Sequence, residues 1–306
     1  MEKGMLDGRV VIVTGGGRGL GRAHGLELAR HGATVIVNDL GVGLHGEDDA
    51  RAPAAEVVSE IEAAGGTAQA DGTSVTDFAG VAALIERTVD QYGRLDAVVN
   101  NAGIVRDRIM TAMTEEEFDL VVAVHLKGTF NLCRHASAFW KARAKAGEAV
   151  SGRIVNTTSG AGLFGNVGQA NYGPAKAAIA SLTMITAMEM ERYGVTANAV
   201  SPLARTRMTE GLASMQGGGG GWDRYDPANA SPVVAWLCSA SSAWLSGAVL
   251  RIDGDTVQQL SPWDVDSTRT YRGAPGQPPD ATQLGRGLRV AFGALPSGLP
   301  STSIGG

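Results

Sequence analysis

The stretch Thr14-Gly15-Gly16-Gly17-Arg18-Gly19-Leu20-Gly21 decides the fold of this 306-residue chain. It follows a short apolar run over residues 9–13, typical of a buried parallel strand, and it precedes an apolar pattern of helical spacing over 20–31. Glycines let the chain turn sharply between strand and helix. They also let a pyrophosphate approach the free N–H groups at the helix N-terminus. This order of strand, glycine loop and helix predicts a dinucleotide-binding fold.

Short apolar strands and helices alternate along most of the chain. This alternation predicts an α/β fold, a Rossmann-type doubly wound parallel sheet in a single domain over residues 1–255. Residues 256–306 are rich in Pro, Gly, Ser and Thr without clear periodicity, so we expect an irregular C-terminal extension there. We expect strands over 34–37, 95–99, 153–156, 196–200 and 249–252, helices over 57–64, 81–91, 172–192 and 232–239, and one long helix from the capping box at 114–117 through residue 132 and beyond.

Composition excludes several classes of protein. Hydrophobic residues make up 44% of the chain, which supports a large core and excludes wholesale disorder. The net charge of −5 argues against a nucleic-acid partner, and no apolar run approaches the roughly 20 residues of a membrane span. Cys133 and Cys238 are interpreted as reduced core thiols, and we predict no metal site. The first strand pattern begins within ten residues of Met1, so we expect no secretion signal and a cytoplasmic location.

Asp39 indicates which dinucleotide would bind. It stands at the end of the second predicted strand, eighteen residues after the glycine loop. A carboxylate there accepts hydrogen bonds from the adenosine ribose hydroxyls and repels a 2′-phosphate. Arg18 argues the other way, because its guanidinium could pair with that phosphate. The Arg18 side chain can swing into solvent, whereas a fixed carboxylate cannot avoid the repulsion, so we predict NAD.

Ser159, Tyr172 and Lys176 form the sharpest chemical signal in the sequence. Tyr172 and Lys176 are four residues apart and so share one face of the predicted helix. An ammonium beside a phenol lowers the phenol's pKa from about 10 towards working pH, which makes Tyr172 a general base for alcohol oxidation. Ser159 follows a strand, so it lies at the carboxyl edge of the sheet where such folds bind ligands.

These motifs resemble the short-chain dehydrogenase/reductase family over residues 7 to about 255, as does Asn100-Asn101-Ala102-Gly103. The resemblance implies Tyr172 as the base, Lys176 as a group that also holds the nicotinamide ribose, and Ser159 as the group that orients the substrate oxygen. It implies homodimers or homotetramers built on the helices at 117–134 and 172–192. It places the cofactor against Gly15, Arg18, Gly19, Leu20, Gly21, Asp39, Leu40, Ser74, Val75, Asn101, Ala102, Gly103, Tyr172, Lys176 and Pro202.

The sequence departs from the family at a few positions. His125 stands where the family has an Asn whose backbone carbonyl holds a water of the proton relay, and His125 can keep that role. For that reason it is counted with the catalytic residues. Thr73 replaces the usual acidic residue beside the adenine. Arg207 stands where a Thr is expected after Pro202, which leaves the nicotinamide carboxamide contacts open.

A narrower resemblance concerns the substrate. The stretches 38–41, 104–108, 165–172 and 207–209 are similar to the hydroxyacyl-CoA dehydrogenase units of peroxisomal multifunctional enzymes. That similarity implies a small-molecule alcohol or ketone in lipid metabolism, an acyl-CoA thioester oxidised with NAD. A hydroxysteroid dehydrogenase and an NADPH-dependent 3-oxoacyl-carrier-protein reductase remain alternatives. A non-catalytic dinucleotide sensor would not need Ser159, Tyr172 and Lys176, which together form the proton-transfer group.

Two further segments lie outside these motifs. Residues 208–225 lie where the family has its substrate lid, and Met208, Leu212, Met215 and Trp222 are candidates to contact the substrate. Arg205 and Arg207 could meet a CoA phosphate, or they could be solvated. The extension carries too many apolar residues for a solvated linker. We therefore expect it to pack on a neighbouring subunit or on the rim of the cleft.

Overall fold

The computed structural model describes residues 4–41, 52–205, 222–261, 267, 270–272, 275 and 278–292. The chain forms two compact units, Met1–Leu260 and Ser261–Gly306. The first unit holds the whole sheet and all of the described candidate site residues. No helix among the described residues is long and apolar enough to cross a membrane.

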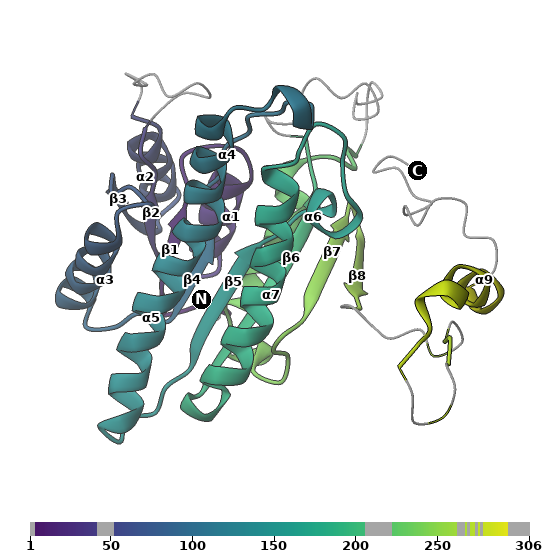
Figure 1. Cartoon of the computed structure of the whole chain (residues 1–306). Helices are drawn as coiled ribbons and strands as arrows, with labels where there is room; N and C mark the ends of the chain where they lie inside the picture. Colours follow the sequence, from purple (N-terminus) through teal and green to yellow (C-terminus); the bar gives the residue numbers. More distant parts are fainter. Residues whose placement is uncertain are drawn as a thin grey trace. The chain divides into compact units, whose positions relative to one another are not determined.

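The first unit is built on one eight-stranded sheet in the order β3-β2-β1-β4-β5-β6-β7-β8 (Figure 1). All neighbouring strands are parallel except β7 and β8. The strand order reverses between β1 and β4, and ligands bind at such a switch point, beyond the carboxyl ends of the strands. The predicted doubly wound sheet is confirmed. The strands are β1 (Val10–Thr14), β2 (Thr34–Asn38), β3 (Thr67–Asp71), β4 (Ala97–Asn100), β5 (Gly152–Thr157), β6 (Val195–Leu203), β7 (Val249–Asp253) and β8 (Thr256–Leu260).

Helices cover both faces of this sheet, and each layer closes one hydrophobic core (Figure 1). One face packs against α1 (Gly19–Arg30), α2 (Pro53–Ala63) and α8 (Ser231–Leu237). The other packs against α3 (Phe78–Tyr92), α5 (Gly128–Lys145) and α7 (Tyr172–Met190). Shorter elements are α4 (Glu115–Val122), η2 (Ala123–Lys127), α6 (Gly160–Phe164), η1 (Met110–Ala112), η3 (Glu191–Tyr193), η5 (Pro227–Ala230) and η6 (Ala240–Ser242).

Four elements differ from the sequence expectations, each for a physical reason. The edge strand β3 was not predicted, because only Ala68 of its five residues is buried and it lacks an apolar run. The five-residue helix α6 contains two glycines and gives no helical signal. The predicted long helix is interrupted by the π-helical turn η2. Residues 256–260 were expected to be irregular, but they form β8, an exposed strand paired with β7.

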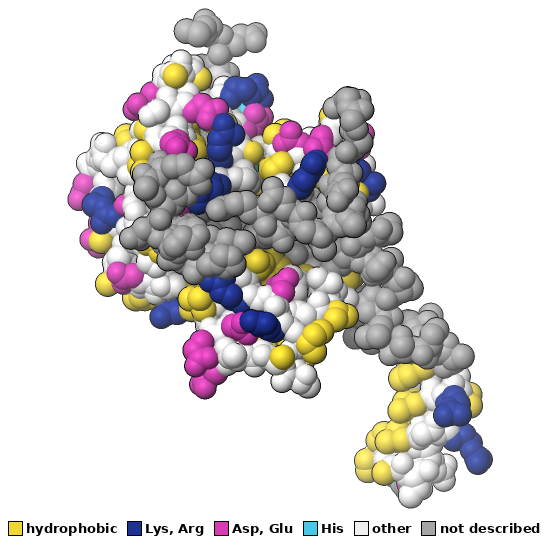
Figure 2. All heavy atoms as spheres, turned by 90° about the horizontal axis from the view of Figure 1, so that it is seen from above, with side chains coloured by type: hydrophobic (Ala, Val, Ile, Leu, Met, Phe, Trp, Pro, Cys, Tyr) yellow, Lys and Arg dark blue, Asp and Glu magenta, His cyan; other side chains and the backbone are white. Residues whose placement is uncertain are grey.

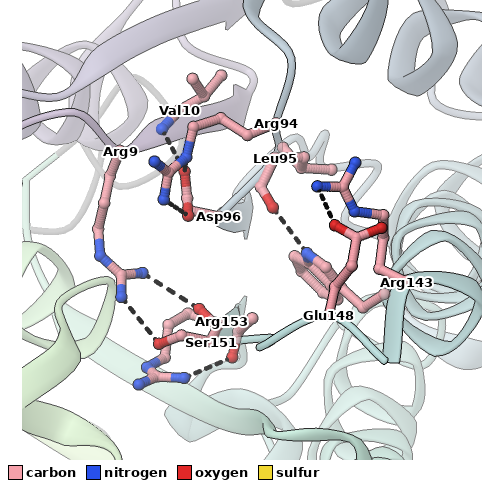
Figure 3. Close-up of polar contacts among 11 residues, drawn as sticks. Arg9, Val10, Arg94, Leu95, Asp96, Arg143, Glu148, Ser151 and Arg153 are labelled. Atoms are coloured by element: carbon pink, nitrogen blue, oxygen red, sulfur yellow. Dashed lines mark hydrogen bonds and ion pairs between the residues drawn. The ribbon is translucent and has the colours of Figure 1, made fainter. Parts of the chain in front are cut away.

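Charged side chains gather at the amino ends of β1, β4 and β5 (Figure 3). Arg9 reaches across the sheet and donates to the Ser151 hydroxyl at 2.9 Å. Arg94 binds both carboxylate oxygens of Asp96, each at 2.7 Å. Arg153 is buried and donates to two backbone carbonyls. This edge of the sheet is opposite the one that the glycine loop occupies.

The second unit contains one helix, α9 (Ala281–Phe292), where the sequence led us to expect no periodic structure. None of its residues is buried. Figure 2 shows its apolar side chains along one side of the helix and its arginine side chains along another. Gly287 lets the Tyr271 ring approach, since a Cβ there would lie 2.2 Å from a ring carbon. A short helix with two internal glycines has little stability of its own, so α9 needs a surface to cover its apolar side.

Candidate active site

Two glycines of the loop are packed so closely that a side chain would not fit at their positions. Gly15 has φ +61°, and a Cβ there would lie 2.8 Å from the Ala102 Cα. A Cβ on Gly21 would lie 2.0 Å from the Gly15 carbonyl oxygen. Gly19 opens helix α1, also at positive φ. The loop therefore presents backbone N–H groups at a helix N-terminus, as a pyrophosphate requires.

The end of β4 is tied to this loop by hydrogen bonds. The Thr14 hydroxyl accepts from the backbone N–H groups of Asn101 and Ala102, both at 3.1 Å. The Asn101 amide donates to the carbonyls of Thr14 and Gly15, both at 3.1 Å. The two chain segments that were expected to line the dinucleotide are thus held as one surface.

Asp39 is fixed at the end of β2 by two backbone donors. Gly17 N–H donates to one of its carboxylate oxygens and Gly41 N–H to the other, both at 2.9 Å. Arg18 is half-buried and its Nη2 atom does not reach solvent. The sequence argument had this guanidinium free to swing into solvent, and in this conformation it does not. One premise of the prediction of NAD, a mobile Arg18, is therefore not met, and the fixed Asp39 carboxylate is the premise that remains.

The other expected cofactor residues lie along the same edge. Val75 accepts a 2.8 Å hydrogen bond from the Asn131 amide through its carbonyl, and Ser74 pairs with the Thr76 hydroxyl at 2.9 Å. The carbonyl of Thr73 accepts from Asn38 at 2.8 Å. Leu40 is exposed after β2, Leu20 is half-buried at the start of α1, and Pro202 is half-buried near the end of β6.

Tyr172 begins helix α7 because Asn171 caps the helix. The Asn171 side-chain oxygen accepts from Tyr172 N–H at 2.7 Å, and its amide donates to two backbone carbonyls of the 106–117 segment. Ser159 caps α6, and burial raises the pKa of Tyr172 while hydrogen bonding to Ser159 acts in the opposite direction. The two predicted catalytic side chains therefore lie in the same part of the sheet edge.

Lys176 lies one turn further along α7 and is buried. Its ammonium donates to the Thr157 carbonyl at 2.6 Å and stands 5.6 Å from the centroid of the Tyr172 ring. Burial lowers the pKa of Lys176 to about 7. Burial also raises the pKa of Tyr172, with the Ser159 hydrogen bond lowering it and the charge of Asp107 raising it further. The pKa of Tyr172 is thus raised, where the sequence led us to expect that Lys176 would lower it, and burial is the largest cause.

His125 is the central residue of the π-helical turn η2 and is buried. Its ring meets the Tyr172 ring edge-on, with centroids 5.0 Å apart and an interplanar angle of 89°. Its Nε2 atom lies 2.7 Å from the Ile104 carbonyl oxygen and 3.0 Å from the Ile104 nitrogen. The sequence predicted a role for this position through its backbone carbonyl, and the contacts of the ring are additional to that role.

The residues around the expected lid are described only in part. Arg205 forms an ion pair with Asp223, so it is not a free cation for a CoA phosphate. Trp222 is exposed and rests on Gly254, where a Cβ would lie 2.5 Å from the indole. Arg207, Met208, Leu212 and Met215 lie outside the described residues.

Three residues of the site were missed by sequence reasoning. Thr14 joins the glycine loop to the end of β4, and Thr157 supplies the acceptor for Lys176. Neither role leaves a signal in a single sequence, because each depends on pairing between distant strands. Asn171 could have been found, since Asn directly before a helix is a favoured N-cap.

The geometry of this edge is that of a nicotinamide-dependent oxidoreductase, and comparison with known proteins gives the same class. The chain belongs to the short-chain dehydrogenase family, whose sequence profile matches residues 9–217. The family acts with a nicotinamide cofactor. The residues present fit such a group: a glycine cradle that side chains would fill, a fixed carboxylate beside it, and the Thr157 hydroxyl oxygen, which is buried without a partner among the described residues.

Three individual proteins are similar to this chain over most of its length. Hydroxyacyl-CoA dehydrogenase ChsB1 of Mycobacterium tuberculosis is 42% identical over 294 residues, which cover 94% of this chain and 89% of that protein. Peroxisomal multifunctional enzyme type 2 of Drosophila melanogaster is 44% identical over 236 residues, 77% of this chain and 37% of that enzyme. The crystal structure of a short chain dehydrogenase from Mycobacterium avium is 46% identical, with a TM-score of 0.85, and the match covers 98% of this chain and 100% of that one.

Proposed function

We propose that this chain is an NAD-dependent 3-hydroxyacyl-CoA dehydrogenase with Tyr172 as its general base. The observation that carries the proposal is the buried Lys176, whose ammonium stands 5.6 Å from the centroid of the Tyr172 ring, at the same sheet edge as the fixed Asp39 carboxylate. Two relatives, one named as a hydroxyacyl-CoA dehydrogenase and one as a peroxisomal multifunctional enzyme, support the substrate class.

Each residue of the proton-transfer group has a defined task in this proposal. Ser159 holds the substrate hydroxyl oxygen, and Tyr172 accepts the proton of that hydroxyl. Lys176 stabilises the phenolate by its charge and binds the nicotinamide ribose, and the His125 backbone carbonyl holds a water of the proton relay. The bound nicotinamide supplies the hydride acceptor. Because burial and the charge of Asp107 raise the pKa of Tyr172, the base needs positive charge nearby before it can work near neutral pH.

The cofactor would lie along the glycine loop, with its adenosine ribose against Asp39. Both carboxylate oxygens of Asp39 are held by backbone N–H groups, so the charge cannot turn away from a 2′-phosphate. The adenine would pack near Ser74 and Val75, and the nicotinamide half near Asn101, Gly103 and Pro202. This arrangement supports NAD over NADP.

Exposed apolar side chains on two segments that adjoin the start of α7 support a bulky acyl substrate. The 104–113 and 165–171 segments are joined by a bridge between Arg108 and Gln169. Three large hydrophobic side chains of these segments remain exposed: Ile109 at 56%, Met110 at 72% and Val167 at 85%. Exposed apolar side chains that gather on one surface are a common feature of ligand-binding sites.

Initial rates of NADH formation test the proposal. The substrates would be (3R)-3-hydroxyacyl-CoA thioesters of several chain lengths, their (3S) epimers, hydroxysteroids and a 3-hydroxyacyl carrier protein, each with NAD and with NADP. We expect turnover of the (3R) thioesters with NAD. Faster turnover of a steroid, or of the carrier protein with NADP, would contradict the proposed substrate or cofactor, and Tyr172→Phe would serve as the inactive control.

A homodimer or homotetramer is also part of the proposal. The outer faces of α5 and α7 carry exposed apolar side chains, among them Phe130 at 44%, Ile185 at 45% and Met188 at 71%. The uncovered apolar side of α9 would pack on such a neighbouring subunit. A cytoplasmic location is supported by the two buried, free cysteines.

Sedimentation at micromolar concentration tests this assembly. We expect a dimer or tetramer that weakens when the chain is truncated after Leu260, with NADH binding retained. A monomeric full-length chain would contradict the assembly. A truncated chain with unchanged mass, melting temperature and substrate range would show that the second unit has no such role.

A further inference from the structure

We infer that the imidazole of His125 is a positioning residue that fixes the Gly103-Ile104 backbone and the Tyr172 ring relative to each other. The backbone segment belongs to the expected cofactor surface, and the ring belongs to the proton-transfer group. The inference about turnover rests on the proposed function, whereas the inference about dinucleotide binding needs only the family's cofactor.

The first part of this arrangement is the attachment of His125 to Ile104. Its Nε2 atom lies within hydrogen-bond distance of both the carbonyl oxygen and the nitrogen of that one residue, at 2.7 and 3.0 Å. A neutral imidazole carries one N–H, so Nε2 either donates to the carbonyl or accepts from the N–H. Both tautomers keep the ring attached to Ile104, at the end of the segment that Thr14 and Asn101 tie to the glycine loop.

The second part is the close packing of the ring on Gly103. A Cβ on Gly103 would lie 2.3 Å from the Cε1 atom of His125 and 3.1 Å from each ring nitrogen. The ring therefore occupies the space that any larger residue at position 103 would need. The packing of the His125 ring therefore requires glycine at position 103, whether or not a cofactor also approaches this residue.

The third part is the perpendicular contact with Tyr172, at 5.0 Å between the ring centroids. Edge-to-face aromatic pairs favour this geometry, and it restricts the rotation of the phenol. An Asn in place of His125 could bind both Ile104 groups at once, one with its oxygen and one with its amide. The attachment alone therefore does not require an imidazole, and the contact with Tyr172 is what the ring adds.

The ring acts here by position and not by charge. Burial is the largest cause that lowers the pKa of His125, to about 3, and the Lys176 charge lowers it further. The Nδ1 atom is buried and has no partner among the described residues. An unpartnered buried nitrogen is unfavourable, so a purely structural role would favour a residue without it.

A set of variants separates the two contacts. His125→Asn keeps the attachment to Ile104 and loses the ring, His125→Phe keeps a ring and loses the attachment, and His125→Ala loses both. His24→Ala is the matched control, because His24 is also fully buried in α1, with one ring nitrogen 2.9 Å from the Ser231 hydroxyl and the other without a partner in the described part of the chain. The readouts are NADH affinity by fluorescence titration, kcat, KM and melting temperature.

We expect His125→Phe and His125→Ala to weaken NADH binding by about tenfold, the effect of losing a hydrogen bond at the cofactor surface. His125→Asn should restore NADH affinity but keep kcat about tenfold below wild type with KM unchanged, because Tyr172 is no longer held. His24→Ala should lower only the melting temperature. Wild-type NADH affinity in His125→Phe, or wild-type kcat in His125→Asn, would overturn the inference.

A second-site test covers the case in which the single variants are unstable. Gly103→Ala should abolish measurable NADH binding, and adding His125→Ala should recover part of it, because the smaller side chain makes room for the new methyl group. A double variant that binds no better than Gly103→Ala would overturn the packing argument. If wild type binds NADH but oxidises no hydroxyacyl-CoA, the proposed function fails and the binding part of the inference still stands.

Discussion

Positively charged side chains are buried at both ends of the parallel strands, which form the amino edge and the carboxyl edge of the sheet. The two edges differ in the partners that these side chains have. At the amino edge, Arg153 and Arg9 donate to backbone carbonyls and a serine hydroxyl, and Arg94 pairs with Asp96 (Figure 3). At the carboxyl edge, Lys176 has three N–H donors, and among the described residues one acceptor, the Thr157 carbonyl, takes one of them.

The two edges also differ in whether the buried side chain keeps its charge at neutral pH. Burial lowers the pKa of Arg153 to about 10, so the guanidinium stays charged at neutral pH. Burial lowers the pKa of Lys176 to about 7, so its charge depends on what binds next to it. The amino edge thus holds permanent charges that join strands, while the carboxyl edge holds a charge that a ligand can stabilise.

The largest effect is expected when the proton acceptor is removed. Tyr172→Phe keeps the ring and its contact with His125, so NADH should bind within about threefold of wild type. Turnover should fall by at least about a hundredfold, the lower end of general acid–base contributions. Steady-state rates and fluorescence titration measure both quantities, and turnover near the wild-type rate would contradict the assignment of the base.

A pH series of Lys176→Met tests the buried charge. The folded-state pKa of Lys176, about 7, lies below its unfolded value, so between the two the unfolded chain binds more protons and wild-type stability rises with pH. Methionine does not titrate. From pH 7 to pH 9 wild type should therefore gain about 2 kcal/mol of unfolding free energy relative to the variant. Urea unfolding of both proteins at several pH values measures this, and parallel pH curves would show that Lys176 is not shifted.

At the amino edge, Asp96→Ala should destabilise the fold without touching the chemistry. It leaves the buried Val10 N–H, now 2.8 Å from the carboxylate, without its acceptor, and it frees Arg94. We expect the unfolding free energy to drop by about 2 kcal/mol, with kcat and NADH affinity unchanged. Arg143→Ala is the control at the same edge, because its partner Glu148 is exposed and such pairs contribute less than about 1 kcal/mol.

The smallest effect concerns the choice of cofactor. Asp39→Ala removes the repulsion of a 2′-phosphate, so the ratio of NADPH to NADH affinity should rise by about tenfold. Titration of wild type and variant with both dinucleotides measures the ratio. A wild type that already prefers NADPH would mean that Arg18 decides the choice and Asp39 does not.

Much of the fold could be predicted because local patterns determine it. The β-branched runs of β1 and β2 are buried, and the glycine loop between β1 and α1 combines a strand end with a helix start. Strand β3 escaped prediction because only one of its side chains is buried. Strand β8 escaped because four of its five residues are exposed, so no periodic pattern marks it.

The site could be predicted in its residues but not in its energetics. Ser159, Tyr172 and Lys176 are visible as a motif, and the position of Lys176 beside the Tyr172 ring follows from it. The raised pKa of Tyr172 is not visible, because it depends on burial by residues from several elements. The amino-edge cluster could not be foreseen either, since Arg9 and Ser151 are 142 positions apart.

The amino edge of the sheet is expected to determine stability and the carboxyl edge to determine turnover. The most direct test measures turnover and unfolding free energy in the same preparations of Asp96→Ala, Tyr172→Phe and their double variant. The account predicts that Asp96→Ala loses stability but not turnover, that Tyr172→Phe loses turnover but little stability, and that the double variant shows the sum of both. A folded Asp96→Ala protein with turnover as low as that of Tyr172→Phe would contradict it.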